Sequence, residues 1–196
     1  DPIYIDIGAY DPIKFSNTYK LYQNNWRGIV VDPNKNKIEN WNKIRPNDFI
    51  INSAVVEKEF NQKKIKIYYK QNNSADETAY PLSDKKNLIY YDANTIKFLE
   101  VIKLCEKKFS KPFFINIDIE GNENNLVLEL EQVAYKIPLI CAEFFLKSDS
   151  ENCSIFNFKD VEAIKFLENK GYYLVSVCGP SLIFCHKDYW IPYTRL

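Results

Sequence analysis

Short apolar runs alternate along this chain with segments whose apolar residues follow a helical spacing. Apolar runs rich in Ile, Val and Phe predict buried strands, and apolar residues at every third or fourth position predict amphipathic helices. The predicted strands span residues 3–9, 28–31, 49–56, 64–69, 113–119, 139–145, 172–177 and 182–186. Helices are predicted after the N-cap candidates Ser16, Asn17 and Thr18, around Ile38, Trp41 and Ile44, and over residues 94–109, 122–133 and 159–170.

The order of these segments predicts a single α/β domain over residues 1–196, with a Rossmann-like, doubly wound and mostly parallel sheet. Residues 178–181, which include Gly179 and Pro180, separate the last two strands and predict a C-terminal antiparallel hairpin. The polar segment 71–87 predicts a long loop, either functional or unstructured. Because the chain has no Met and its first strand starts near residue 3, we expect further residues to precede it in the full polypeptide.

Composition narrows the class of protein. Lys and Arg together number 26, as do Asp and Glu, so the net charge of zero disfavours a nucleic-acid partner. The five cysteines show no C-x-x-C spacing and lie mostly in apolar stretches, which favours reduced core thiols and a cytoplasmic location over a zinc site or disulfides. We expect neither a transmembrane segment nor a signal peptide, since no apolar run approaches about 18 residues.

Acids at the ends of predicted strands are the candidate functional residues, because ligands of such sheets bind outside the carboxyl ends of the strands. The first strand ends in Asp6, Ile7 and Gly8 without a G-x-G-x-x-G fingerprint, which disfavours a dinucleotide. A tight glycine turn beside an acid suits a ligand that carries an ammonium group. Asp32 suits a ribose diol, or else starts a turn before Pro33.

A second group of acids follows the later strands. Asp118 is the first candidate for a general base or an orienting group. Glu120 is expected to contact the N-terminus of the following helix. Glu143 is expected to be the third carboxylate on the same edge of the sheet. The alternative is that these acids only cap amides or pair with Arg. Three acids leave a divalent metal open, but no ligand spacing requires one, and we predict none. His186, the only histidine, is expected at a strand end or on the surface, so a histidine base is disfavoured.

Four stretches together resemble the FkbM family of class I S-adenosylmethionine (SAM)-dependent methyltransferases: YIDIGAYDP, FSNTY…NNWRGIVVDPN, INIDIEGNE and LICAEFF. The chain departs from the family pattern at Asn116, where Lys is frequent, and at Tyr10-Asp11, where an Asn-x-Gly continuation is more usual. The resemblance implies SAM as cofactor and methyl transfer to oxygen, on a surface polysaccharide, a lipid-linked sugar or another natural product. The catalytic residues it implies are Asp118, Glu120 and Glu143. The cofactor-binding residues it implies are Asp6, Gly8, Ala9, Tyr10, Ser16, Asn17, Thr18, Asp32, Ser53, Ala54 and Asp118.

Other readings stay open. A methyltransferase-like binding module without activity would keep the same sheet. A nucleic-acid methyltransferase is disfavoured, because residues 118–121 replace the Asn/Asp-Pro-Pro-aromatic segment that amino-group methylation typically uses. The oligomeric state is left undetermined.

Overall fold

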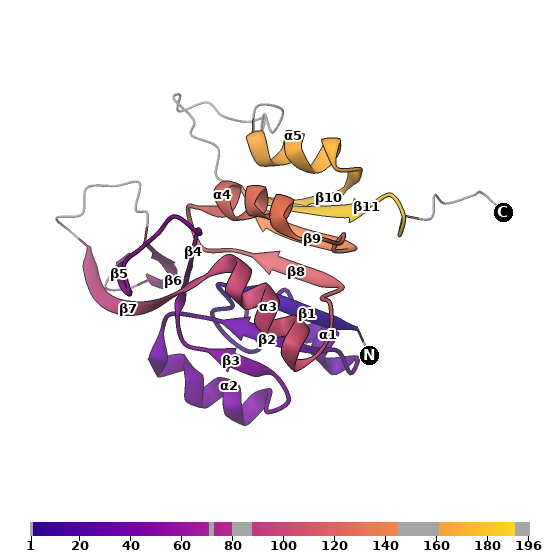
Figure 1. Cartoon of the computed structure of the whole chain (residues 1–196). Coiled ribbons are helices and arrows are strands. Elements are labelled where there is room, and N and C mark those ends of the chain that lie inside the picture. Colours follow the sequence, from indigo (N-terminus) through magenta and orange to yellow (C-terminus); the bar gives the residue numbers. More distant parts are fainter. Residues whose placement is uncertain (1, 71–72, 80–87, 145–160, 191–196) are drawn as a thin grey trace.

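The computed structural model describes residues 2–70, 73–79, 88–144 and 161–190. These residues form a mixed α/β structure with two sheets (Figure 1). The large sheet has the strand order β10-β11-β9-β8-β1-β2-β3, and the small sheet has the order β4-β7-β5-β6. The strands of the large sheet are β1 (Ile3–Ile7), β2 (Arg27–Val31), β3 (Phe49–Ile51), β8 (Phe114–Ile117), β9 (Leu139–Glu143), β10 (Tyr172–Cys178) and β11 (Ser181–His186).

The neighbouring strands β9, β8, β1, β2 and β3 run parallel, whereas β11 runs antiparallel to β9 and to β10. The pairing of β10 with β11 is the hairpin predicted from residues 172–186. Because the carboxyl ends of the five parallel strands lie at one edge, the residues that follow them are brought together.

Helices pack on both faces of the large sheet, as the alternation of side chains along β1 requires. Ile5 and Ile7 belong to the core cluster that contains Phe98, Leu126 and Leu167. Those three residues lie in α3 (Phe98–Lys108), α4 (Glu123–Leu128) and α5 (Glu162–Asn169). The opposite face holds a second cluster with Tyr4 and Val30, against which α1 (Tyr19–Gln23) and α2 (Ile38–Ile44) pack through Leu21 and Trp41. Two short 3-10 helices, η1 (Lys35–Lys37) and η3 (Glu129–Gln132), complete the helical elements described.

The prediction of one strand over residues 49–56 was wrong, because the chain changes sheet at Asn52 and Ser53. β3 belongs to the large sheet, and β4 (Ala54–Val56) pairs with β7 in the small sheet. The Asn52 side-chain amide donates to the backbone carbonyl of Asp32 at 3.0 Å, and the Ser53 amide donates to the Ile51 carbonyl at 3.2 Å. These bonds hold the bend that separates the two strands.

The helix predicted over 94–109 begins only at Phe98, because β7 (Ile89–Lys97) continues to Lys97. Ile96, which the helical pattern includes, lies opposite Val55 in the parallel pairing of β7 with β4. The predicted loop 71–87 was also wrong in part, since β6 (Asn73–Thr78) pairs with β5 (Lys64–Lys70). Backbone pairing with β5 outweighs the weak strand propensity of this polar segment. Residues 71–72 and 80–87 lie outside the described residues.

Smaller differences concern side chains and element ends. The helix predicted over 122–133 divides into α4 and η3, and Gly171, with φ +87°, follows α5 as expected. His186 ends β11 as predicted but is buried, with its Nε2 atom 3.2 Å from the Lys170 carbonyl oxygen. Cys105, Cys141 and Cys185 are free, buried thiols, whereas Cys178 is exposed, contrary to its assignment to the core. Cys153, Phe145 and the first two residues of the predicted helix 159–170 lie outside the described residues.

No helix within the described residues combines the length and the hydropathy that crossing a lipid bilayer requires.

Candidate functional site

A pocket lies at the carboxyl ends of β1, β2, β8 and β9, where the small sheet meets the large one. It contains all but one of the predicted site residues. The lining includes Asp6, Gly8, Ala9, Tyr10, Ser16, Asn17, Asp32, Ser53, Ala54, Asp118, Glu120 and Glu143. Thr18 lies beneath the pocket instead, fully buried against Asp6.

Gly8 lets the chain turn at the end of β1. Its φ is +75°, and a Cβ atom built on it would lie 1.5 Å from the backbone oxygen of Asp118. Its amide donates to the Val31 carbonyl at 2.9 Å, and the Asp118 amide donates to the Ile7 carbonyl at 3.0 Å. The backbones of β1 and β8 therefore approach here more closely than any side chain allows, and this approach sets the floor of the pocket.

Asp6 anchors the segment that follows this turn. One carboxylate oxygen accepts a hydrogen bond from the Thr18 hydroxyl, and the other accepts one from the Asn116 side-chain amide at 2.9 Å. Asn17 in turn donates to the Asn116 side-chain oxygen at 3.1 Å. Burial raises the pKa of Asp6, while these donors and the Arg45 guanidinium oppose the rise. Asp6 therefore orders the pocket wall as well as lining it.

Arg45 is the buried cation that supports this wall, and sequence reasoning missed it. Its Nε atom donates to Asp48 at 2.7 Å, and its Nη2 atom donates to the hydroxyl of Tyr4 at 2.6 Å and to that of Thr18 at 3.0 Å. A further bond of 3.2 Å reaches the Ser16 hydroxyl. A lone Arg in a helix-end segment carries no sequence signal for such burial, because all its partners but Asp48 come from distant parts of the chain.

Asp32 follows β2 and is buried, with 4 % of its surface exposed. One carboxylate oxygen accepts from the Tyr10 amide at 2.9 Å, and the other accepts from the Asn34 amide at 2.8 Å, as in a turn that Asp initiates. Both predicted roles of Asp32 are thus compatible with its position, since it starts the turn and also faces the pocket. Burial raises the pKa of Asp32 to about 6, with Glu77 adding to the rise and Lys37 opposing it.

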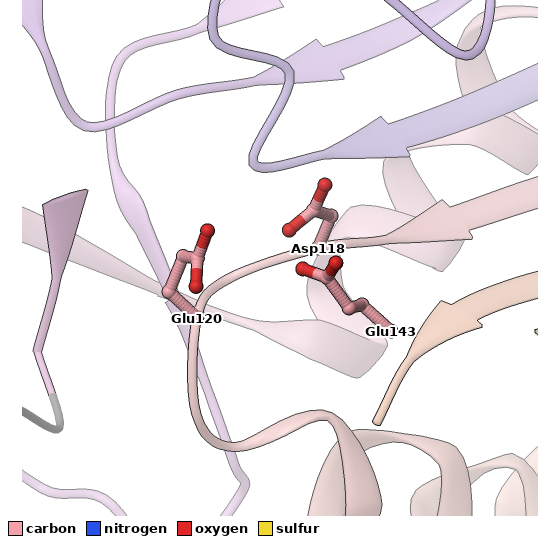
Figure 2. Close-up of side chains that lie close together, drawn as sticks. All are labelled: Asp118, Glu120 and Glu143. Atoms are coloured by element: carbon pink, nitrogen blue, oxygen red, sulfur yellow. The ribbon is translucent and has the colours of Figure 1, made fainter. Parts of the chain in front are cut away.

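The acids Asp118, Glu120 and Glu143 lie close together (Figure 2) and line the pocket. They follow β8 and β9, whereas Asp32 follows β2, which β1 separates from β8 in the sheet. Each offers a carboxylate oxygen within 4.8 Å of the other two. Burial raises the pKa of Glu143 to about 9, and the hydrogen bond and negative charge of Asp118 contribute to the rise. The contact between the two side chains raises the pKa of Glu143 and opposes the rise that burial causes in the pKa of Asp118, so the two carboxyl groups titrate as a pair.

The acid Glu123 accepts hydrogen bonds from the backbone just before α4. Its carboxylate accepts from the Ile119 amide at 2.8 Å and from the Gly121 amide at 3.1 Å. Glu120 stands between these two amides with φ +58°, a region that non-glycine residues rarely adopt. Glu123 thus holds the turn before α4, and Glu120 lies in that turn and lines the pocket.

Two charged lining residues were missed by the sequence analysis. Lys37 lies 4.1 Å above the Tyr10 ring, and its Nζ atom is 3.4 Å from Glu77 and 4.0 Å from Asp32. Glu77 comes from β6, within the segment predicted to be a loop. Among the described lining residues, Lys37 is the one Lys or Arg, so carboxylates dominate the charge of the pocket.

The pocket therefore gathers carboxylates at the carboxyl ends of parallel strands. Comparison with known families identifies the class of protein as a methyltransferase. Residues 6–174 match the model of the methyltransferase FkbM domain. The chain belongs to the FkbM methyltransferase family. Comparison with curated proteins and with solved structures gave no match.

Proposed function

We propose that this protein is a SAM-dependent O-methyltransferase whose acceptor is a hydroxyl group of a glycan sugar or of a small natural product. The observation that carries the proposal is the pairing of Asp118 with Glu143 in the same pocket as Asp32, in a chain of the methyltransferase family. Such a pocket offers one place for a ribose and one for a reacting hydroxyl.

The residues present fit SAM by their chemistry. Each oxygen of Asp32 accepts one backbone amide and keeps a second lone pair, so the carboxylate is able to accept hydrogen bonds from a ribose diol. Val31, Ala54 and Val55 line the pocket beside it and offer apolar contact to a purine. The acids at the other end suit a positively charged sulfonium. When bound, SAM supplies an electrophilic methyl group.

The residues of the chain have separate roles in this proposal. Asp118 accepts a hydrogen bond from the acceptor hydroxyl, orients it and takes its proton as the oxygen reacts. Glu143, protonated, donates to Asp118 and fixes its orientation. Glu120 completes the carboxylate surface. The large sheet, parallel over five strands and covered by helices on both faces, supports a Rossmann-like, doubly wound assignment.

Calorimetric titration with SAM, with S-adenosylhomocysteine (SAH) and with NAD tests the cofactor assignment. We expect micromolar binding of SAM and SAH and none of NAD. Absence of binding by the folded chain would contradict the proposal and favour a methyltransferase-like module without activity. Asp32→Ala is expected to abolish binding, because it removes both acceptor oxygens.

Asp118→Ala separates chemistry from binding. We expect this variant to keep its affinity for SAH and to lose methyl transfer by orders of magnitude, measured with tritiated SAM and a panel of methyl glycosides. Full activity would remove Asp118 from the mechanism. We further propose a cytoplasmic location, on the strength of the free thiols, and no nucleic-acid partner, on the strength of the neutral charge.

A further inference from the structure

Strand β6 belongs to the small sheet, yet its last two residues contact the two ends of the pocket in the large sheet. Successive side chains of a strand point to opposite faces, so the neighbours Glu77 and Thr78 reach different partners. Glu77 lies at the Asp32 end, and Thr78 contacts the turn that carries Glu120. The two residues therefore connect the small sheet to both parts of the site.

Glu77 organises the surroundings of Asp32. One of its carboxylate oxygens accepts from the Asn34 side-chain amide at 2.8 Å and lies 3.4 Å from the Lys37 ammonium. The other accepts from the hydroxyl of Tyr91, on β7, at 2.5 Å. Its side chain is only 8 % exposed. Glu77 thus holds the cation of Lys37 beside Asp32 in a setting shielded from water.

Thr78 holds the turn that carries Glu120. Its hydroxyl donates to the backbone carbonyl of Glu120 at 2.6 Å. Glu120 has φ +58°, a conformation that costs a non-glycine residue about 1–3 kcal/mol and persists only when its surroundings enforce it. Glu123 holds the amides on either side of Glu120, and Thr78 holds its carbonyl. The direction of the Glu120 carboxylate therefore depends on Thr78.

We propose that Glu77 and Thr78 are positioning residues, with Glu77 arranging Lys37 and Asn34 around the ribose carboxylate and Thr78 placing Glu120 in the acid cluster beside the sulfonium. This inference rests on the proposed function. It assigns a role to the small sheet, which aligns the two ends of the cofactor site. It also predicts different effects of the two residues on binding, because only one end of the cofactor carries the sulfonium charge. Thr78 is expected to affect the preference for SAM over SAH, and Glu77 the affinity for both.

The ratio of the dissociation constants of SAH and SAM measures the placement of the acid cluster without any acceptor. SAM carries a sulfonium and SAH a neutral thioether, so carboxylates near the sulfur favour SAM. Calorimetry on the full chain gives both constants for wild type, Thr78→Val, Thr78→Ser and Glu77→Gln. Thr95→Val is the matched control, since the Thr95 hydroxyl donates to the Gln62 carbonyl at 2.7 Å on the same sheet, outside the pocket lining.

Thr78→Val is expected to reduce the preference for SAM over SAH by about threefold to tenfold, the effect of one lost hydrogen bond, with SAH binding nearly unchanged. Thr78→Ser restores the preference, and Thr95→Val keeps it. Glu77→Gln is expected to weaken both ligands by a similar factor. It also shifts the pH midpoint of SAH binding downward. Two charges face Asp32, and the substitution removes the Glu77 carboxylate, which raises the pKa of Asp32, and keeps the Lys37 ammonium, which lowers it.

An unchanged preference in Thr78→Val, or a loss that Thr78→Ser does not restore, would overturn the role of Thr78. Unchanged SAH binding in Glu77→Gln would overturn that of Glu77. If Thr78→Val fails to fold in a thermal unfolding assay, Thr78→Ala carries the same expectation. If the proposed function is wrong, the wild-type protein itself binds neither SAM nor SAH. That result differs from the outcomes above and would also overturn the positioning roles.

Discussion

The replacement of Gly8 by Ala tests the close approach of β1 and β8 that forms the pocket floor. Gly179 supplies a matched control, because its φ of +62° is also positive but no atom lies within 4 Å of its hypothetical Cβ atom. The two glycines therefore share the conformational requirement and differ in the space available. Comparing Gly8→Ala with Gly179→Ala isolates the cost of the steric clash.

The expected magnitude follows from the contacts. A positive φ costs an L-residue about 1–2 kcal/mol, and this is the whole expected effect of Gly179→Ala. At Gly8 the new methyl group would lie 1.5 Å from the Asp118 backbone oxygen, so the two strand ends must separate. The bond from the Asp118 amide to the Ile7 carbonyl, now 3.0 Å, then breaks. Each of the two buried groups left unpaired costs about 1–3 kcal/mol, so with the cost of the positive φ we expect Gly8→Ala to lose about 3–8 kcal/mol in total.

Urea unfolding monitored by circular dichroism measures both variants against wild type, and calorimetry with SAH measures the pocket. We expect Gly8→Ala to bind SAH weakly or not at all even where it is folded, while Gly179→Ala binds as wild type does. A free energy of unfolding for Gly8→Ala within about 1 kcal/mol of that for Gly179→Ala would refute the argument from close approach.

Three further results are expected. Arg45→Met should lower the free energy of unfolding, measured by urea denaturation, by about 3–5 kcal/mol, because it leaves the buried Asp48 carboxylate without its cation. A decrease of less than about 1 kcal/mol would contradict this expectation. Binding of SAH should weaken as the pH falls through about 6, since Asp32 with its raised pKa becomes protonated there and loses acceptor capacity. The Asp32→Asn variant should bind SAH weakly at every pH. A midpoint near pH 4 for SAH binding by wild type would be inconsistent with the burial of Asp32. The carboxyl carbon of Glu143 should titrate in NMR near pH 9. Asp118→Asn should lower that midpoint by removing the neighbouring negative charge. A wild-type midpoint below pH 6 would exclude a proton held between Glu143 and Asp118.

Much of the site could be predicted because parallel strands present their carboxyl ends at one edge. Asp6, Asp32, Asp118 and Glu143 each stand at or just after an apolar run, so local pattern alone brings them together once the strands are parallel. Gly8 is a similar case, since a single glycine after a strand marks a turn. Which of these acids lie side by side still depends on the strand order β9-β8-β1-β2.

The contribution of the small sheet could not be predicted in the same way. Glu77 and Thr78 lie in a polar segment without the alternation of a half-buried strand, and only pairing with β5 makes it one. The break between β3 and β4 likewise depends on a bond from Asn52 to the backbone of Asp32. Such bonds join positions far apart in the sequence, so no local pattern indicates them.

By itself the sequence indicated the family through four short motifs. Hydrophobic periodicity indicated the alternation of strands and helices and the acids at the strand ends, because both are local patterns. Only the tertiary structure decided that Glu143 lies beside Asp118, that Glu123 holds the turn before α4, and that Lys37 faces Asp32. Those outcomes depend on distances of a few ångströms between separate elements and on burial, which strengthens each charge interaction by excluding water.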